Sequence, residues 1–398
     1  MRLRWLSDTS LVVSMRLLVT CDMGFERELM RELVELSGAR ITSVLSGRVF
    51  AEVSSSMLAN VFRSRIANNI YGLLVVEENV RSLDDVYRVV KGIDFATLIE
   101  PSQSFAIRSE RIGVHSFTSI DIGRVAGQAV IDSYMQARGV RLRVDLGEPD
   151  VEIYTELNGS RLIVALSLTR VSLHVRGYKV FAHPAGLKNT IACAMLRIAE
   201  WRPGEGLYDP MCGGGTIVIE AALQAKGVEV PCIARRNIDW GVLARVFPEA
   251  VEDLEKLCSR GVAEGERIHV GVDINPVFVE GAVVNAKSAG VDDATLFSVG
   301  NSIAFTPKLK ELEGEFGVSF AVAVFNPPYG YRMKPGALGR LYKEILSALM
   351  NSGFSTVVFI TSAIRVSEAV LQELRFTEVD RLKVVHGALP SIVYRLKF

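Results

Sequence analysis

The chain has 398 residues, of which 49% are hydrophobic and 23% are charged, and its formal net charge at pH 7 is zero. This composition excludes a largely disordered chain, and the length favours two or three domains. The balanced charge excludes a uniformly basic surface, so any nucleic-acid-binding surface must be a local patch. The early apolar runs on either side of Arg16 are too short to cross a membrane.

The first 80 residues predict a small α+β domain. Hydrophobic spacing and turn residues indicate a strand, a helix, two strands, a helix and a strand, over residues 17–20, 24–36, 41–45, 48–53, 56–68 and 69–76. This order is the split βαβ pattern of ferredoxin-like folds. We therefore expect a ferredoxin-like domain over residues 1–80.

The next stretch, residues 81–170, predicts a second α+β domain. We expect a helix over 82–92, a short strand over 105–108, and a helix that begins after the Ser/Thr residues of 117–119. Asn158-Gly159 is a strong turn signal between two strands, 153–157 and 161–167. Residues 171–186 then read as a linker.

From residue 187 to residue 398, helices and strands alternate. Strands are expected at residues 206–209, 268–273, 295–299, 320–325 and 356–361, followed by a hairpin of 378–386 and 392–397. Such alternation predicts an α/β, Rossmann-like domain whose seven-stranded, mostly parallel sheet is covered on both faces. A terminal hairpin on such a sheet is typical of methyltransferases and unlike nicotinamide dehydrogenases.

A glycine loop after the first of these strands predicts a cofactor site. The segment Asp209-Pro-Met-Cys-Gly-Gly-Gly-Thr216 leads into an apolar helix. Glycines let a ligand approach the backbone, and a helix N-terminus favours polar or anionic groups. Because Asp209 would repel a pyrophosphate, the loop favours a cationic ligand with an amino-acid head, such as S-adenosylmethionine, over a dinucleotide.

Two polar residues follow the next strands. Asp273 ends the second strand, where an acidic residue binds a ribose diol in nucleotide folds, although a strand-end cap is the alternative role. Asn301 follows the third strand, where the adenine ring should lie. Since the usual gap from the glycines to the acidic residue is about 20 residues, we expect residues 227–266 to be an insertion.

The segment Asn326-Pro-Pro-Tyr-Gly330 is the most specific signal. The exocyclic amine of a base is a poor nucleophile, because its lone pair is delocalised into the ring. The Asn326 side-chain oxygen and the Pro327 carbonyl are placed to accept its two hydrogens, and Tyr329 is placed to stack on the base. The segment therefore predicts methyl transfer to a flipped-out base, driven mainly by positioning.

The cysteines and histidines are weaker candidates. None of the five cysteines forms a C-x-x-C pair, so no zinc site is expected, and an odd, scattered set is typical of a reducing compartment. The histidines His115, His174 and His183 are expected to be linker or surface residues.

These motifs together resemble the archaeal and bacterial THUMP-domain tRNA guanine-N2 methyltransferases, which modify guanosine 6 in the acceptor stem. The resemblance rests on residues 176–204, 209–222 and 326–330, and residues 105–130 are similar to THUMP domains. It implies a THUMP domain over 81–170 and a methyltransferase domain over 187–398. The family more often has aspartate where this chain has Asn301.

The resemblance implies S-adenosylmethionine as cofactor and tRNA as partner, in a cytoplasmic monomer without metal. The implied catalytic residues are Asn326, Pro327, Pro328 and Tyr329. The implied cofactor site consists of Asp209, Met211, Cys212, Gly213, Gly215, Thr216, Asp273, Ile274, Asn301, Ser302 and Asn326. The residues expected to contact RNA are Arg108, Arg176, Tyr178, Lys179, Lys188, Arg235 and Arg236.

Three alternatives stay open. Enzymes with very similar motifs methylate guanine N2 of 23S ribosomal RNA. Adenine N6 is a chemically competent acceptor at such a loop, but the THUMP-like segment favours RNA over DNA. A non-catalytic RNA-binding protein with a decayed methyltransferase domain is the alternative from a different class, and the intact Asp209, Asp273 and Asn326 argue against it.

Overall fold

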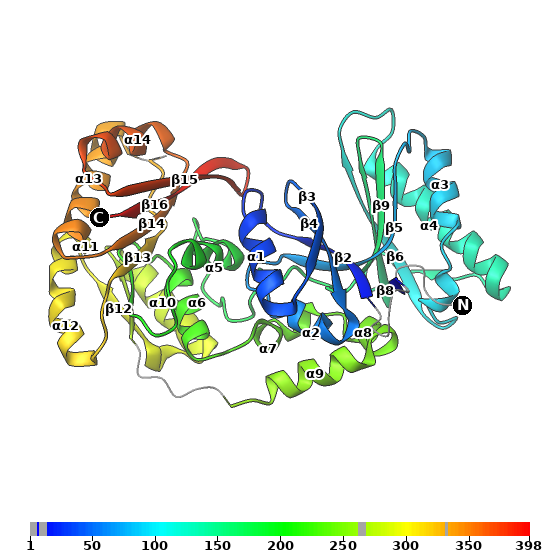
Figure 1. The fold of residues 1–398 in the computed structure, drawn as a ribbon, viewed down its shortest axis with the longest axis horizontal. Helices are drawn as coiled ribbons and strands as arrows, with labels where there is room; N and C mark the ends of the chain where they lie inside the picture. Colours follow the sequence, from blue (N-terminus) through cyan, green and yellow to red (C-terminus); the bar gives the residue numbers. More distant parts are fainter. Residues whose placement is uncertain (1–5, 8–13, 262–267, 331–332) are drawn as a thin grey trace.

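The computed structural model describes residues 6–7, 14–261, 268–330 and 333–398. In these residues the chain forms two large sheets, one of nine strands in the N-terminal half and one of seven strands in the C-terminal half. Figure 1 shows an elongated molecule with the seven-stranded sheet at one end, α3 and α4 at the other, and α1 with its strands between them.

The nine-stranded sheet joins the first two predicted domains. Its strands are β1 (Leu6–Ser7), β2 (Ser14–Thr20), β3 (Arg40–Leu45), β4 (Arg48–Ser54), β5 (Asn69–Glu77), β6 (Ser104–Ile112), β7 (Arg143–Val144), β8 (Val151–Asn158) and β9 (Arg161–Ser167). The antiparallel order β3-β4-β2-β5 is the ferredoxin-like one that the sequence predicted. Because β5 also pairs with β9, the sheet continues without a break into β9-β8-β6-β7.

The helices of this half are α1 (Glu26–Ser37), α2 (Leu58–Val61), α3 (Leu83–Lys91) and α4 (Ser119–Arg138), and side-chain caps begin α3 and α4. Thr118 and Asp121 form a capping box at the start of α4, in agreement with the predicted Ser/Thr cap. The same arrangement of Ser82 and Asp85 begins α3. The strand β6 is longer than predicted, because it pairs in parallel with β8 along its length.

The helix predicted over residues 56–68 is wrong in length. Only a 3₁₀ turn and the single turn α2 form there. The buried carboxylate of Glu32 accepts hydrogen bonds from the backbone N–H groups of Arg65 and Ile66, at 3.1 and 3.2 Å. These bonds replace the intrahelical bonds that a longer helix would need, and the chain turns into β5 instead.

The C-terminal half has the strand order β12-β11-β10-β13-β14-β16-β15. The sheet has seven strands and is parallel except for the last hairpin, and these two features are the ones that the sequence predicted. Its strands are β10 (Leu207–Asp209), β11 (His269–Asp273), β12 (Thr295–Val299), β13 (Val322–Phe325), β14 (Thr356–Thr361), β15 (Glu378–His386) and β16 (Leu389–Lys397). The covering helices are α5 (Asn189–Ile198), α6 (Thr216–Ala225), α10 (Pro276–Ala289), α11 (Ser302–Phe305), α12 (Leu309–Phe316), α13 (Pro335–Asn351) and α14 (Ile364–Glu373).

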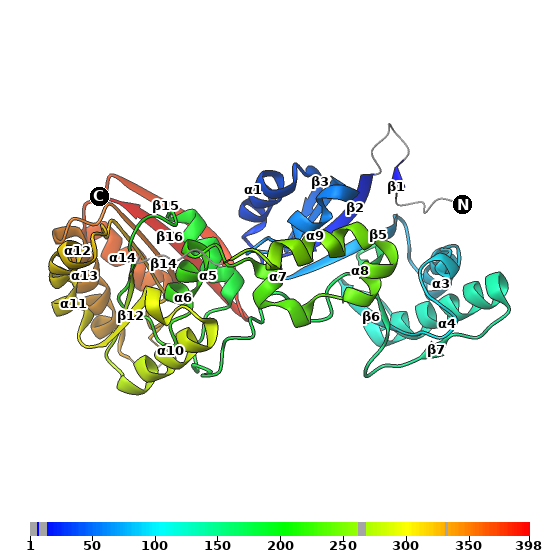
Figure 2. The ribbon, with the colours of Figure 1, turned by 90° about the horizontal axis from the view of Figure 1, so that it is seen from below.

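The expected insertion forms a helical arm, whose last residues lie outside the described ones. Its helices are α7 (Val230–Ile233), α8 (Trp240–Val246) and α9 (Pro248–Cys258). Figures 1 and 2 both show α9 running along the N-terminal half, where it contacts α2. Arg63 forms a 2.8 Å ion pair with Glu229, and Arg245 donates to the Gln103 side chain at 2.8 Å. The arm therefore connects the two halves of the molecule.

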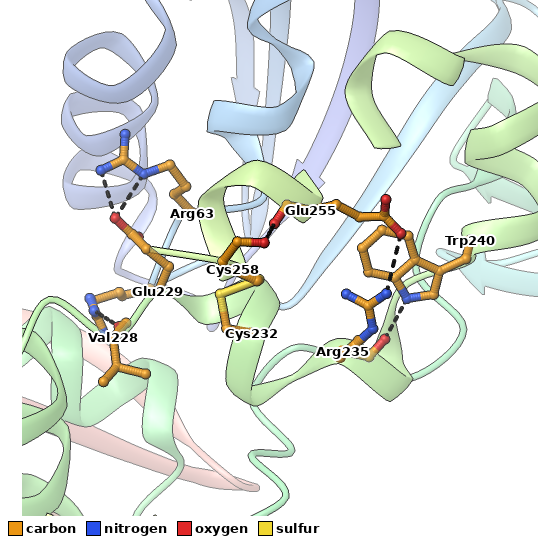
Figure 3. Close-up of a disulfide and its surroundings, with 10 residues drawn as sticks. Arg63, Val228, Glu229, Cys232, Arg235, Trp240, Glu255 and Cys258 are labelled. Carbon is orange, nitrogen blue, oxygen red and sulfur yellow. Dashed lines mark hydrogen bonds and ion pairs between the residues drawn. A yellow bond between two sulfur atoms is a disulfide. The ribbon is translucent and has the colours of Figure 1, made fainter. Parts of the chain in front are cut away.

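A disulfide closes this arm, contrary to the expectation of a fully reduced set of cysteines. Cys232 in α7 is bonded to Cys258 at the end of α9 (Figure 3). No local pattern in the sequence indicates this pairing, because α8 and most of α9 separate the two residues. The other three cysteines are buried and free: Cys21, Cys193 and Cys212.

One hydrophobic cluster runs through both halves. It includes Leu17 of the first sheet, Leu196 of α5, Val242 of α8 and Val393 of β16. The domain limits that we infer, 1–80, 81–170, 171–186 and 187–398, therefore divide a continuous core and stay a proposal. In the described part of the chain, no helix has the length and apolarity that a bilayer crossing requires.

Candidate functional site

Four polar residues lie at the carboxyl edge of the seven-stranded sheet. Asp209 ends β10 and Asp273 ends β11, while Asn301 lies two residues after β12 and Asn326 directly follows β13. The four strands are neighbours in the order β12-β11-β10-β13, so their carboxyl ends form one continuous edge. Open α/β sheets bind ligands at this edge, next to the strand where the chain order reverses.

The glycine loop lies directly on this edge. Gly215 precedes α6 with φ +81°, a conformation that favours glycine, and a Cβ there would lie 2.9 Å from the Phe297 ring. The Gly213 N–H donates to Asp273 Oδ2 at 2.9 Å. The loop is thus held close to the end of β11, and the N-terminus of α6 faces the edge. The neighbouring residues Cys212 and Thr216 are buried, and Met211 is half-buried.

Asp209 is a buried carboxylate. Only 1% of its surface is exposed, and its Oδ1 accepts the Met211 N–H at 3.0 Å. Burial raises the pKa of Asp209 well above the ordinary value, and the nearby Asp273 raises it further, against the opposing effect of the Met211 N–H. A cation brought to this edge would lower that pKa and relieve the cost of burial, so the carboxylate suits a positively charged ligand.

The neighbouring strand ends present side chains already ordered by the backbone. Asp273 Oδ1 accepts the Asn275 N–H, and Asn301 Oδ1 accepts the Ile303 N–H, each at 2.9 Å. Ile274 is 76% exposed at the same edge, while Ser302 is buried at the start of α11. Asp273 is therefore fixed as an acceptor, as a ribose diol requires, and Ile274 offers an apolar surface beside it.

The loop after β13 holds an unused hydrogen-bond acceptor. Asn326 Oδ1 is buried and has no hydrogen-bond partner among the described residues, while its Nδ2 donates to the Ala185 carbonyl at 3.5 Å. The Tyr342 hydroxyl donates to the Pro328 carbonyl at 2.9 Å, which holds the loop against α13. A buried acceptor without a donor costs folding free energy, so its retention indicates a ligand that supplies the donor.

Two histidines lie at this site: His183, which we expected to be a linker or surface residue, and His386, which no sequence motif singled out. The His183 ring packs against Gly213, with its Nε2 3.2 Å from the position of an added Cβ, and meets the edge of Phe278 at a centroid distance of 4.1 Å. Burial lowers the pKa of His183, although Asp273 raises it. His386 bonds to Tyr329 from the turn between β15 and β16. Neither residue has a local sequence signal, because each reaches the site through tertiary packing.

The residues expected to contact RNA are spread over three parts of the molecule. Arg108 lies on β6 and pairs with Glu152 at 2.7 Å. Lys188 precedes α5 and pairs with Asp22 at 2.6 Å. Arg235 stacks on Trp240 in the helical arm, and Arg236 beside it is exposed.

Of the other predicted RNA contacts, Arg176 and Tyr178 are wrong in this structure, whereas the half-buried Lys179 stays a prediction. Arg176 and Tyr178 are buried, and both bind the buried Glu220 of α6, at 3.4 and 3.0 Å. Although burial raises the pKa of Glu220, Arg176 and Arg65 hold it below the ordinary value. Lys179 is turned inward onto the Leu187 carbonyl, and burial lowers its pKa to about 8. Arg176 and Tyr178 therefore fasten the linker to α6 and are too buried to contact an RNA.

Metal binding has no support in the described residues, where no three His, Cys, Asp or Glu side chains form a cluster able to hold an ion. The chemistry at this edge is that of oriented acceptors: two carboxylates, two amides and backbone carbonyls around a glycine loop. Such a set suits a cationic cofactor and an amine-bearing acceptor.

Comparisons with known proteins agree with this geometry. Residues 176–391 match the family model described as RMKL-like, methyltransferase domain, and residues 80–167 match the THUMP domain. The tRNA (guanine(6)-N2)-methyltransferase of Archaeoglobus fulgidus is 40% identical over 96% of this chain and 91% of its own length. The enzyme of the same name from Methanocaldococcus jannaschii is 35% identical over 95% of this chain and 98% of its own.

The fold is also found in solved structures. The crystal structure of a possible methylase from Clostridium difficile 630 superposes with a TM-score of 0.82, covering 96% of this chain and 98% of that one. The sequence identity is 22%, so this similarity supports the fold and does not indicate the function.

Proposed function

The chain belongs to the family of THUMP-domain tRNA (guanine(6)-N2)-methyltransferases, and from this premise we propose that it transfers a methyl group from S-adenosylmethionine to N2 of guanosine 6 in tRNA. The observation that carries the proposal is the buried Oδ1 of Asn326 at the carboxyl edge of the sheet, which has no hydrogen-bond partner among the described residues. An exocyclic amine supplies the donor that this atom lacks.

The residues at the edge fit the cofactor. Asp209 matches a cationic group, and Asp273 is oriented by the Gly213 and Asn275 N–H groups to accept from a ribose. Asn301 and Ile274 would line the adenine, and Gly213, Gly215 and the N-terminus of α6 would face the amino-acid head. When bound, S-adenosylmethionine supplies an electrophilic methyl group on a sulfonium.

The loop of residues 326–330 prepares the acceptor. Asn326 Oδ1 and the Pro327 carbonyl accept the two hydrogens of the amine, which directs the nitrogen lone pair out of the ring plane. Tyr329 stacks on the base, and the Pro328 carbonyl is tied to Tyr342, so the loop keeps its shape. The proton that leaves the nitrogen after transfer passes to solvent, since positioning rather than a strong base carries this reaction.

The tRNA substrate is favoured over 23S ribosomal RNA. Both named relatives above are tRNA enzymes and are similar over nearly their whole length, including the THUMP domain. Arg108, Lys188, Arg235 and Arg236 are the exposed or half-exposed cations that we assign to RNA contact. Action as a cytoplasmic monomer without metal is part of the same proposal.

The test is nucleoside analysis after incubation with radiolabelled S-adenosylmethionine. Separate pools of unmodified tRNA and ribosomal RNA are used, and we expect N2-methylguanosine from the tRNA pool, mapped to position 6. Label only in ribosomal RNA would move the assignment to the alternative substrate. The absence of label from both pools, with no thermal shift on adding the cofactor, would favour the decayed RNA-binding protein.

Asn326→Ala is the matching variant. We expect at least a hundredfold loss of methylation, about 3 kcal/mol of transition-state stabilisation, with cofactor affinity nearly unchanged. Asn326→Gln, which keeps the amide but moves it outward, should also fail. An equal loss of activity and cofactor affinity in Asn326→Ala would show that the residue is structural.

A further inference from the structure

The ring of Tyr329 meets a side chain from a distant part of the fold. Its hydroxyl lies 2.9 Å from Nδ1 of His386, and the two rings are nearly perpendicular, with an interplanar angle of 83° and centroids 6.1 Å apart. His386 is the last residue of β15, and Gly387 after it has φ +63° in the hairpin turn. The contact therefore joins the loop after β13 to the turn between β15 and β16.

The environment of His386 favours an imidazole that accepts this hydrogen bond. Burial lowers the pKa of His386; the nearby Asp22 raises it, and Lys188 lowers it again. Asp22 and Lys188 are themselves joined by a 2.6 Å ion pair, so their charges largely offset each other at the ring. A neutral ring carries one N–H, and Nδ1 is then free to accept from the tyrosine hydroxyl while Nε2 carries the proton.

The backbone that carries His386 is anchored to the N-terminal half. The Val385 N–H donates to the Met23 carbonyl at 3.0 Å. Gly24 packs so closely on the same strand that an added Cβ would lie 2.3 Å from the Lys383 carbonyl oxygen. The backbone at His386 is therefore fixed by these contacts, so the imidazole can hold the tyrosine hydroxyl in place.

We propose that His386 is a positioning residue, which fixes the plane of the Tyr329 ring through the Nδ1 hydrogen bond and so sets the surface on which the target base stacks. This inference rests on the proposed function, because it gives Tyr329 the role of a stacking platform. A ring held at its hydroxyl loses little further rotational freedom when the base arrives, so the bond improves the alignment of the amine with Asn326.

Three substitutions of His386 separate positioning from general packing. His386→Asn places an amide group near the position of Nδ1, whereas His386→Gln places it near the position of Nε2, and His386→Ala has neither. We expect His386→Ala and His386→Gln to lower kcat/KM for tRNA about three- to tenfold, the usual range for one hydrogen bond. His386→Asn should restore the rate to within about twofold of the wild type. Cofactor Kd should not change in any of them.

Tyr329→Phe keeps the ring and removes the hydroxyl, so its kcat/KM for tRNA should equal that of His386→Ala. The double variant should have a kcat/KM no lower than either single variant. The proposal would be overturned if kcat/KM of His386→Asn were no higher than that of His386→Gln. It would also be overturned if the losses in the two single variants multiplied in the double variant.

An NMR measurement keeps this test separate from that of the proposed function. In the chain labelled with ¹⁵N-histidine, we expect His386 as the neutral Nε2–H tautomer, with an Nδ1 shift that moves in Tyr329→Phe. An unchanged His386 signal in Tyr329→Phe would refute the hydrogen bond. If the wild-type protein failed to methylate tRNA, the proposed function would be contradicted. The NMR measurement would still test the hydrogen bond between His386 and Tyr329, because it does not depend on activity.

Discussion

Two buried polar atoms at the carboxyl edge work against the stability of the folded protein. Asp209 keeps a carboxylate in a site where burial opposes its charge, and the Asn326 amide oxygen has no donor in the part of the chain that the structure describes. Neither arrangement is explained by packing, because a neutral or smaller side chain would remove the cost. Residues of this kind are expected where a ligand supplies the missing partner.

Asp209→Asn should therefore stabilise the protein while it abolishes cofactor binding. The amide oxygen can still accept the Met211 N–H, but the buried charge is gone. We expect a gain of about 1 kcal/mol, or about 2–4 °C in Tm, measured by calorimetry without cofactor. A lower Tm in this variant would show that the carboxylate is a structural group.

The pH dependence of that gain follows from the direction of the pKa shift. Because the folded protein holds the pKa of Asp209 above the ordinary value, the wild type loses stability as the pH rises from about 4 through the folded pKa. The gain from Asp209→Asn should therefore be absent in acid, where the carboxyl group is protonated in both states, and largest at neutral pH. Unfolding curves of both proteins at a series of pH values measure this difference.

At the scale of elements, the helical arm between β10 and β11 contacts both the N-terminal half and the linker. It contacts the N-terminal half through Glu229 and Arg245, and Asn237 in its centre donates from its side chain to the Ser172 and Val175 carbonyls of the linker, each at 2.8 Å. The disulfide of Cys232 and Cys258 closes the arm around α8 (Figure 3). The arm is thus a cross-linked brace between the halves.

Reduction of this disulfide should destabilise the brace. The bond spans 26 residues of sequence, and closing a loop of this length removes enough unfolded-state entropy to contribute about 3 kcal/mol. We expect a reductant to lower the Tm of the wild type, and a Cys232→Ser, Cys258→Ser double variant to have that lower Tm with or without reductant.

Thiol titration supplies an independent count for the same bond. Of the five cysteines, three should react in the denatured, unreduced protein, and all five should react after reduction. Five reactive thiols before reduction would show that the bond is absent.

At the scale of the whole molecule, the two halves share a core and a docked hairpin. The hydrophobic cluster that begins at Leu17 reaches Val393 of β16, and the buried Arg176 links Glu220 of α6 to the Arg65 carbonyl of the N-terminal half. Removing residues 1–170 would expose this surface, so the deletion is a poor test of RNA binding. Substitutions in the full chain are the better probe of how the halves cooperate.

Gly24 offers such a probe, with Gly38 as its control. Both have positive φ, +99° and +63°, but a Cβ at Gly24 would collide with β15, whereas nothing lies within 4 Å of one at Gly38. Gly38→Ala should cost only the backbone penalty of about 1 kcal/mol. Gly24→Ala should lower the Tm further and also reduce tRNA methylation, because the docked hairpin carries His386. If Gly24→Ala and Gly38→Ala lowered Tm and activity by the same amounts, the docking of β15 on the N-terminal half would not matter for methylation.

The sequence alone determined the features that depend on local pattern. The seven-stranded sheet, the ferredoxin-like order and the capping of α4 follow from hydrophobic spacing and cap residues, which act within a few positions of the chain. The placement of Asp209, Asp273, Asn301 and Asn326 at one edge also follows, because each stands at the end of a predicted strand and parallel strands end together.

Only the tertiary structure decided the features that depend on distant partners. Arg176 looks like a surface cation until Glu220 is brought beside it, and burial with that partner makes it a structural residue. Cys232 meets Cys258, β5 meets β9, and His386 meets Tyr329 only after long connections close. Local residue preferences carry no record of which remote groups will pair, because the pairing free energy arises from burial and geometry that exist only in the folded chain.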